Sequence, residues 1–182
     1  MTPVLTIGVV ADTHIPDRMR AIPERVYGIF DGVTAILHAG DLSAPRVLDD
    51  LGRIAPVHAV AGNSDFLRLR LPLNRVLEFD GVRIGLTHGH GGWGRYLVEK
   101  VIYHAAGYRV RRYLRLARSR FAEVDVVVFG HTHRPMNCWD EGVLMFNPGS
   151  LGPDYVPPNG PAVGLLRIEA GTVLGEIVGL RA

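Results

Sequence analysis

Short apolar runs and segments with helical spacing alternate along the first third of the chain. Residues 4–10, 33–37 and 57–60 are apolar runs of strand length, and β-branched side chains are frequent in them. Between the runs, apolar positions recur at helical intervals in residues 18–30, and a shorter helix is predicted for residues 44–51. Ser43 can cap that helix, and Pro45 occupies a first-turn position that tolerates proline. The predicted order is strand, helix, strand, helix, strand.

The second part of the chain contains more strands. Asn74–Phe79 and Val82–Thr87 fit the two arms of a β-hairpin joined by Asp80-Gly81, a dipeptide typical of tight turns. Residues 96–121 are predicted to be largely helical, with a break or kink at Gly107. Later strands are predicted at residues 124–129, 142–146, 162–169 and 172–178, the last two joined by Ala170-Gly171. This order predicts an α/β sandwich of sheets with helices outside.

Composition and charge narrow the class of protein. A chain of 182 residues with 47% hydrophobic content can bury one substantial core, so we expect a single domain over residues 1–182. No run approaches the roughly 18 uncharged apolar residues that cross a bilayer, and no signal peptide is visible, so we expect a soluble, cytoplasmic protein with no membrane partner. The single cysteine, Cys138, excludes an internal disulfide framework. A net charge of +2 gives no indication of nucleic-acid binding.

Polar side chains follow the ends of several predicted strands, in loops that contain glycine. The ligand crevice of an α/β sheet lies outside the carboxyl ends of its strands, so this recurrence predicts one common site. The side chains are Asp12 and His14, Asp41, Asn63 and Asp65, His88 and His90, and His131 and His133. They combine carboxylates, an amide and imidazoles without a thiolate. Such a set suits manganese, iron, nickel, cobalt or zinc better than it suits a thiolate-rich structural zinc site.

Five short motifs occur in a fixed order along the chain. They are Asp12-Thr13-His14, Gly40-Asp41, Gly62-Asn63, His88-Gly89-His90 and Gly130-His131-Thr132-His133. Together they resemble the motifs of the calcineurin-like metallophosphoesterase superfamily, and the chain is similar in length to its small bacterial and archaeal phosphodiesterase branch. The resemblance implies a four-layer α/β/β/α sandwich of two mixed β-sheets flanked by helices. It also implies a dinuclear centre of two divalent transition-metal ions, for which we expect manganese, with nickel, iron, zinc or cobalt as alternatives.

The resemblance also implies a role for each ligand. Asp12, His14 and His133 would hold the first ion, and Asn63, His88 and His131 the second; Asp41 would bridge both. A hydroxide bridging the two ions would then attack phosphorus in line with the leaving oxygen, and the resemblance to the small phosphodiesterase branch implies a phosphodiesterase. In the last motif we expect an extended segment running along the metal pair, with His131 reaching one ion and His133 the other.

The third motif departs from that of many larger superfamily members, because Ser64 stands where they carry a histidine near the leaving group. His90 is then the best remaining catalytic candidate for contacting the scissile phosphate or the leaving oxygen, and Asp65 is a candidate for orienting a neighbouring group. Because a good leaving group needs less help from an acid, we expect aryl diesters to be cleaved more readily than alkyl diesters. His38 lies inside a predicted strand, and we expect it to be a buried group behind the site.

Two other functions stay open on the sequence. The motifs also resemble the small metallophosphoesterase-fold subunit of the eukaryotic retromer coat, a scaffold that departs from the metal pattern at the second and third motifs. Asp41 and Asn63 are both present here, which favours an enzyme. A phosphomonoesterase would use the same metal ions and would differ only in the shape of its pocket.

The expected partner is a small phosphodiester or nucleotide-like substrate. Arg111, Arg115 and Arg118 share one face of a predicted helix, which is either a solvated face or a surface that attracts anions. Nucleic acid is not the expected partner, because few stacking aromatic residues are interleaved with these arginines. Self-association into a homo-oligomer stays open.

Overall fold

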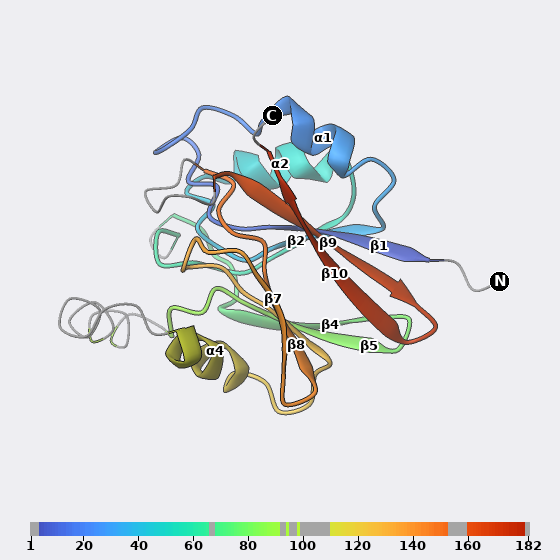
Figure 1. Cartoon of the computed structure of the whole chain (residues 1–182). Coiled ribbons are helices and arrows are strands. Elements are labelled where there is room, and N and C mark those ends of the chain that lie inside the picture. Colours follow the sequence, from blue (N-terminus) through green and yellow to red (C-terminus); the bar gives the residue numbers. More distant parts are fainter. Residues whose placement is uncertain are drawn as a thin grey trace.

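Two five-stranded mixed sheets form the centre of the fold (Figure 1). The computed structural model describes residues 4–65, 68–91, 94, 98, 110–152 and 160–180. The first sheet has the order β10-β9-β1-β2-β3, in which β1, β2 and β3 run parallel and β9 and β10 run antiparallel to their neighbours. Its strands are β1 (Leu5–Val10), β2 (Ala35–His38), β3 (Val57–Ala59), β9 (Ala162–Glu169) and β10 (Thr172–Gly179).

The second sheet has the order β4-β5-β6-β8-β7. Its inner strands β5, β6 and β8 run parallel, and the edge strands β4 and β7 are antiparallel to them. The strands are β4 (Asn74–Phe79), β5 (Val82–Thr87), β6 (Val126–Val128), β7 (Met136–Asp140) and β8 (Val143–Asn147). The parallel strands of the second sheet therefore lie in its interior, whereas in the first sheet the parallel strand β3 forms one edge.

The helices lie outside the two sheets. Helices α1 (Glu24–Ile29) and α2 (Arg46–Gly52) cover the outer face of the first sheet, and α4 (Val110–Arg118) covers the second (Figure 1). Between the sheets, buried side chains from both pack into one core, represented by Ile7 and Phe146. The four-layer α/β/β/α arrangement predicted from the resemblance is therefore confirmed.

Two predicted helices differ from those observed. Helix α1 begins only at Glu24, because Pro23 stands at its N-cap with an extended ψ of 139°. Proline also disfavours helical geometry at the residue before it, so residues 18–22 cannot continue the helix backwards. The capping role predicted for Ser43 is wrong as well: Pro45 is the N-cap of α2, and no side chain caps it.

The hairpin turns follow the predicted chemistry. Asp80 and Gly81 both have positive φ, as do Ala170 and Gly171, which is the conformation of the tight turns that join twisted antiparallel strands. Strand β7 was not predicted, because its alternation leaves Trp139 61% exposed on an edge strand and hides the usual apolar signal. Helix α4 lies within the helical segment predicted for residues 96–121, whereas the expected break at Gly107 lies outside the described residues.

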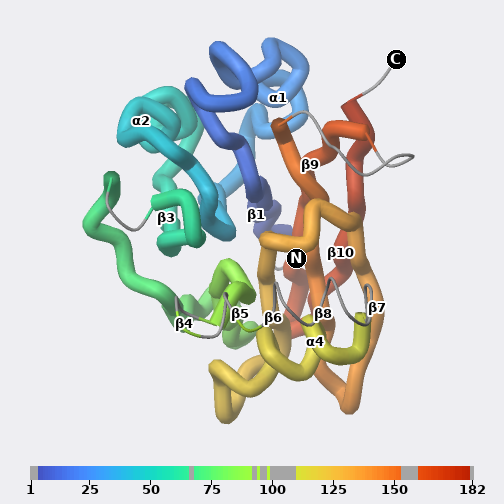
Figure 2. The backbone as a smooth tube through the Cα atoms, turned by 90° about the vertical axis from the view of Figure 1, so that its left-hand side faces the viewer, coloured from blue at the N-terminus to red at the C-terminus, as the bar shows by residue number. Residues whose placement is uncertain are grey.

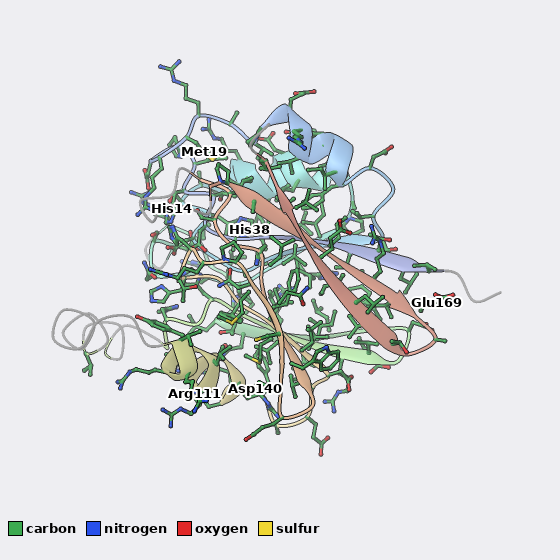
Figure 3. All side chains as sticks on the ribbon, in the orientation of Figure 1. His14, Met19, His38, Arg111, Asp140 and Glu169 are labelled. Atoms are coloured by element: carbon green, nitrogen blue, oxygen red, sulfur yellow. The ribbon has the colours of Figure 1, made fainter. Side chains whose placement is uncertain are left out.

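The parallel strands of both sheets end at the same end of the sandwich. Figure 2 looks onto this end, and Figure 3 labels His14 there and Glu169 at the opposite end. The loops that follow β1, β2 and β3 therefore face those that follow β5, β6 and β8. Among the described residues, no helix is long and apolar enough to cross a membrane.

Candidate metal centre

The loops at this end bring all seven predicted metal ligands together. Three loops of the first sheet supply Asp12 and His14, Asp41, and Asn63, and two loops of the second supply His88, and His131 and His133. These residues are far apart in the sequence. The parallel topology brings them together, because the strands that precede them end at the same edge. The cluster can be described as two halves that meet at Asp41.

The first half consists of Asp12, His14 and His133. One ligand atom from each lies within 4.8 Å of the others. Oδ1 of Asp12 and Nε2 of His14 are buried without a hydrogen-bond partner in the described part of the chain, and Nε2 of His133 stands 3.3 Å from Oδ1 of Asp12. Buried polar atoms without partners are costly in a folded protein, so these two, close together among three potential ligand atoms, indicate a site that could hold a cation.

The second half consists of Asn63, His88 and His131. Nδ1 of His88 lies 2.7 Å from the carbonyl oxygen of Ala39. Because a carbonyl oxygen can only accept a hydrogen bond, Nδ1 carries the proton and donates it, and Nε2 has a free lone pair. Oδ1 of Asn63, also an acceptor, stands 3.2 Å from this nitrogen. The ring of His131 approaches that of His88 with centroids 5.2 Å apart. An imidazole held in one tautomer by a backbone carbonyl is the usual state of a metal-bound histidine.

Asp41 lies between the two halves. Its Oδ2 is 3.5 Å from Nε2 of His14, and its Oδ1 is 3.6 Å from Nε2 of His88. The backbone amide of Ser64 donates to Oδ1 at 2.8 Å and fixes the direction of the carboxylate. Each half of the cluster thus receives one oxygen of the same carboxylate.

The spacing and chemistry of these donors fit divalent transition metals. Ligands bound at about 2.1 Å to one ion stand roughly 3 to 3.5 Å apart, close to the separations of 3.2 to 3.6 Å found here. Asp12 is shared more widely than the sequence predicted, since it also clusters with Asp41 and His88 within 4.8 Å. The two halves are therefore close neighbours with acidic oxygens at their junction.

Backbone strain is concentrated at the ligands. Nine described non-glycine residues have positive φ, and five of them are predicted ligands. These five are Asp12, His14, Asp41, His131 and His133. A non-glycine residue in this conformation costs on the order of 1 to 3 kcal/mol and persists where the surroundings fix it, as at binding sites.

The last motif is not extended, so that expectation is wrong. His131 has φ 67° and His133 has φ 56°, and Thr132 between them donates its amide to the Gly130 carbonyl at 2.7 Å. The segment bends at both histidines. The two rings nevertheless diverge, His131 towards His88 and His133 towards His14.

Two glycines of the motifs are required by close approach. A Cβ atom at Gly62 would overlap Oδ1 of Asp41. At Gly40, φ is 91° and a Cβ atom would lie 2.7 Å from Nδ1 of His88. Any side chain at either position would displace a ligand, which explains why the motifs join glycine to the ligand residues.

Asp65 holds the loops of the site by their backbone. Its side chain is fully buried, and its two oxygens accept the amides of Asp41, Ser43 and Gly62, each at 2.8 Å. The predicted orienting role thus falls on the backbone around Asp41. With both oxygens occupied in this way, Asp65 positions the backbone of the site.

Replacing Asp65 with asparagine is expected to lower the free energy of unfolding by about 3 kcal/mol. The amide group would turn a donor towards at least one of the three backbone amides and leave it buried without a partner. Urea denaturation would measure the loss. Asp17→Asn is the matched control, because Asp17 forms an exposed ion pair with Arg68 and its loss should cost less than about 1 kcal/mol. Equal losses in the two variants would contradict the prediction.

His38 lies behind the ligands, as expected. Its Nδ1 accepts the amide of Gly40 at 3.2 Å, so Nε2 carries the proton and donates to Oγ1 of Thr13 at 3.3 Å. Burial lowers the pKa of His38 to about 4 and keeps the ring neutral. The neutral ring connects the loop that carries Asp41 with the loop that carries His14.

Two supporting residues lie outside the predicted set of site residues. Asn147 donates from Nδ2 to the carbonyl of Gly130 at 2.9 Å and to Oγ1 of Thr132 at 3.2 Å, and it thereby shapes the last motif. Ser150 donates to the backbone carbonyl of Asp12 at 3.0 Å. Asn147 is the last residue of β8, the sixth parallel strand to end here, and Ser150 follows that strand. That position is the signal that would have identified them.

His90 lies at the edge of the cluster, beside the second half. Its ring centroid is 5.3 Å from that of His88 and 6.3 Å from that of His131. The side chain is buried, and Nδ1 has no hydrogen-bond partner in the described part of the chain. His90 is therefore not one of the predicted ligands, but its ring lies beside two of them.

Burial lowers the pKa of three imidazoles of the site. The pKa of His131 falls to about 3 and that of His90 to about 4, mainly because burial disfavours the charged ring. Burial also lowers the pKa of His14, although Asp41 and Asp12 oppose the shift. Burial alone would raise the pKa of Asp12, but the charge and hydrogen bonding of His133, with His88 and His14, bring it far below its ordinary value. Neutral imidazoles and an ionised carboxylate are the states that bind metal ions.

Comparison with known proteins identifies the family. The sequence profile of the calcineurin-like phosphoesterase superfamily domain matches residues 5–171. The chain belongs to this superfamily. A superfamily relative, a probable metallophosphoesterase of Methanothermobacter thermautotrophicus, is 38% identical over 175 residues, which cover 96% of this chain and 92% of the relative.

Solved structures share the superfamily fold. Vacuolar protein sorting 29 from Cryptosporidium parvum superposes with a TM-score of 0.72 at 20% identity, covering 98% of this chain and 92% of that one. A structurally and functionally characterised archaeal phosphodiesterase superposes with a TM-score of 0.65 at 21% identity, covering 96% and 100%. At these identities the likeness shows the fold, and the chemistry must be argued from the site.

Metal binding is expected to stabilise this metallophosphoesterase. With manganese at about 1,000 times its dissociation constant, binding adds about 4 kcal/mol to the free energy of unfolding. For a chain of this length that raises Tm by about 8 to 16 °C, measured by calorimetry of chelator-treated and manganese-loaded protein. Asp80→Asn, in the hairpin turn, should show the same increase. Identical melting with and without the ion would show that the cluster does not bind manganese.

Proposed function

We propose that the protein is a phosphodiesterase with a dinuclear centre, and that manganese is its working metal. The observation that carries the proposal is the position of Asp41, with one carboxylate oxygen directed at each half of the cluster. A single ion would need only one of these halves. Two ions bridged by a carboxylate suit hydrolysis of a phosphate ester. In that reaction the attacking oxygen of the water and the leaving oxygen of the ester both carry charge, and the ions can stabilise both.

The residues of the chain divide the work between the two ions. Asp12, His14 and His133 would hold the first, and Asn63, His88 and His131 the second, with Asp41 shared. When bound, two such ions supply positive charge that activates water and neutralises the phosphate oxygens. The protein keeps the donors in place through Asp65, which fixes the Asp41 loop, and through the Ala39 carbonyl, which orients His88.

The leaving group receives little acid assistance. Ser64 provides no imidazole, and its amide is used to hold Asp41. Among the described residues at the cluster, His90 is the imidazole that lies outside the ligand set without serving as a buried connector. We assign it to contact with the phosphate or the leaving oxygen. Because the pKa of His90 falls to about 4, its ring is neutral at pH 7 and can orient an oxygen but donates a proton poorly.

Leaving-group dependence tests this proposal. With manganese bound, methyl 4-nitrophenyl phosphate is expected to release nitrophenolate about 10² to 10⁴ times faster than dimethyl phosphate releases methanol, beyond their difference in spontaneous hydrolysis. This range is what a positioned general acid normally recovers for a poor leaving group. Equal enhancement of both esters would show that the enzyme supplies an acid that we have not identified.

Substrate class is tested in the same assay. Turnover of bis(4-nitrophenyl) phosphate above that of 4-nitrophenyl phosphate supports a diesterase, and the reverse order supports a monoesterase. A protein that binds two equivalents of manganese and hydrolyses neither ester would instead be a metal-containing interaction module. The substrates we propose are small phosphodiesters or nucleotide-like molecules.

A further inference from the structure

One side chain of the outer helical layer reaches the metal centre. Tyr113 belongs to α4, and its ring centroid lies 6.1 Å from that of His131, with the two ring planes tilted by 53°. Aromatic rings attract each other at centroid separations of roughly 4.5 to 7 Å, and they prefer tilted arrangements to a face-to-face sandwich. The predicted ligands all lie in loops, so Tyr113 adds a contact from a helix to one of them.

The place of Tyr113 on α4 directs its ring towards the cluster. Ala117, four residues later, is buried in the core between α4 and the second sheet, so Tyr113 lies on the same face of the helix, nearer its start. Long side chains on a helix lean towards its N-terminus. Figure 3 labels Arg111, in the first turn of α4, towards the same end of the sandwich as His14. The ring of Tyr113 therefore leans towards the end that carries the ligands.

His131 is held less firmly by its own surroundings than His88 is. His88 is fully buried, and its Nδ1 donates to the Ala39 carbonyl. His131 is half-buried and lies in the bent last motif, with φ 67°. Its ring contacts those of His88 at 5.2 Å and His90 at 6.3 Å, both from the loop after β5, and that of Tyr113 from α4. Two separate parts of the fold thus pack against this one ligand.

Packing of a ligand side chain before the ion arrives increases metal affinity. Binding includes the cost of fixing the χ angles of each ligand, and a ring that is already packed has met part of that cost. A half-buried imidazole in contact with a second aromatic ring is restricted in this way. Removing the contact would leave His131 more rotamers in the metal-free protein and would weaken the ion it serves.

We infer that Tyr113 is a positioning residue that holds His131 in the orientation required by the second metal ion. The inference rests on the dinuclear centre proposed above and adds that the affinity of its second ion depends on α4. Tyr113 acts by packing of its ring, so position 113 needs an aromatic side chain and does not need the hydroxyl group.

Manganese titration of chelator-treated protein tests this inference without a substrate. Free manganese is quantified by its electron paramagnetic resonance signal, which yields one Kd for each ion. In Tyr113→Leu one Kd should rise about 10-fold, at the lower end of the loss caused by removing a group that orients a metal ligand, and the other should stay within about 2-fold. Tyr113→Phe keeps the ring and should match wild type in both constants.

Leu114→Ala is the control on the same helix. Leu114 packs against the core between α4 and the second sheet, so its truncation loosens α4 and leaves the ring of Tyr113 present. Both manganese constants should stay within about 2-fold of wild type, with circular dichroism confirming the fold of each variant. A rise in Leu114→Ala equal to that in Tyr113→Leu, or an equal rise in Tyr113→Phe, would overturn the inference.

A double variant shows whether Tyr113 acts through His131. In His131→Ala the second ion is already weakened and the ring contact is gone, so adding Tyr113→Leu should change its Kd by less than about 2-fold. A further rise of about 10-fold in the double variant would show that Tyr113 acts on the metal centre by another route, and it would overturn the inference.

Turnover separates positioning of a ligand from contact with the substrate. At a manganese concentration equal to the wild-type Kd of the second ion, Tyr113→Leu should hydrolyse bis(4-nitrophenyl) phosphate about 5-fold more slowly than wild type. The reason is that a 10-fold rise in Kd lowers occupancy from one half to about one tenth. At saturating manganese both kcat and KM should return to within about 2-fold. A raised KM that persists there would show that Tyr113 contacts the substrate instead.

The titration also distinguishes failure of this inference from failure of the proposed function. Wild-type protein that binds one manganese ion would overturn the dinuclear centre and the role of Tyr113 together. Two ions with both constants unchanged in Tyr113→Leu would overturn the role of Tyr113 alone. Two ions, no hydrolysis of any ester and a raised Kd in Tyr113→Leu would overturn the phosphodiesterase and leave the role of Tyr113 standing.

Discussion

Replacing Asp41 with asparagine is expected to reduce diester turnover by about 10³-fold or more. Asp41 is the residue that directs an oxygen at each half of the cluster, at 3.5 Å from His14 and 3.6 Å from His88. An asparagine keeps the shape but offers one neutral oxygen in place of two charged ones. Loss of an outer residue that only orients a metal ligand typically costs 10 to 100-fold, so loss of the shared ligand should cost more.

Metal content and turnover are measured together in this variant. After loading with manganese and gel filtration, wild-type protein should retain two equivalents, and Asp41→Asn one or fewer. The direct effect on folding should be small, because an amide fills the same space. Asp80→Asn is the control for adding an amide at another aspartate, and it should retain both equivalents and full turnover. An Asp41→Asn protein with two equivalents and turnover within 10-fold of wild type would refute the bridging role.

The end of the sandwich at which the site lies could be predicted from the sequence, because parallel strands all end on the same side of a sheet. Once residues 4–10, 33–37 and 57–60 are interpreted as parallel strands, Asp12, Asp41 and Asn63 must follow their carboxyl ends on one edge. The hairpin at Asp80-Gly81 was predictable for a similar reason, since positive φ is required at both turn positions. Local chemistry determines both features.

What the sequence did not show depends on contacts between distant segments. The bend at His131 and His133 is maintained by Asn147, fourteen or more residues away, so periodicity within the motif suggested an extended segment instead. In the sequence Asp65 is one polar residue in a predicted loop, and only the fold shows that it accepts hydrogen bonds from three backbone amides.

His131→Ala and His133→Ala are expected to lose different metal ions. Nε2 of His133 lies 3.3 Å from Oδ1 of Asp12, and its ring is 5.5 Å from that of His14, so its removal weakens the first half. The ring of His131 is 5.2 Å from that of His88, so its removal weakens the second half. Each variant should retain about one equivalent of manganese and lose most diester turnover, because attack on phosphorus uses both ions.

Double variants show which half each histidine serves. Combining His131→Ala with Asn63→Ala removes two ligands from the same ion and should still leave about one equivalent bound. Combining His131→Ala with His14→Ala takes one ligand from each ion and should leave almost none. His58→Ala is the control, since His58 contacts Phe79 away from the cluster, and it should keep two equivalents.

If the double variant His131→Ala with Asn63→Ala lost both ions, two explanations would be open. Either the assignment of His131 to the second half is wrong, or Asp12 and Asp41 couple the ions so tightly that neither binds alone. The single Asn63→Ala variant separates these outcomes, because tight coupling empties both halves there too, whereas a wrong assignment leaves one ion in place.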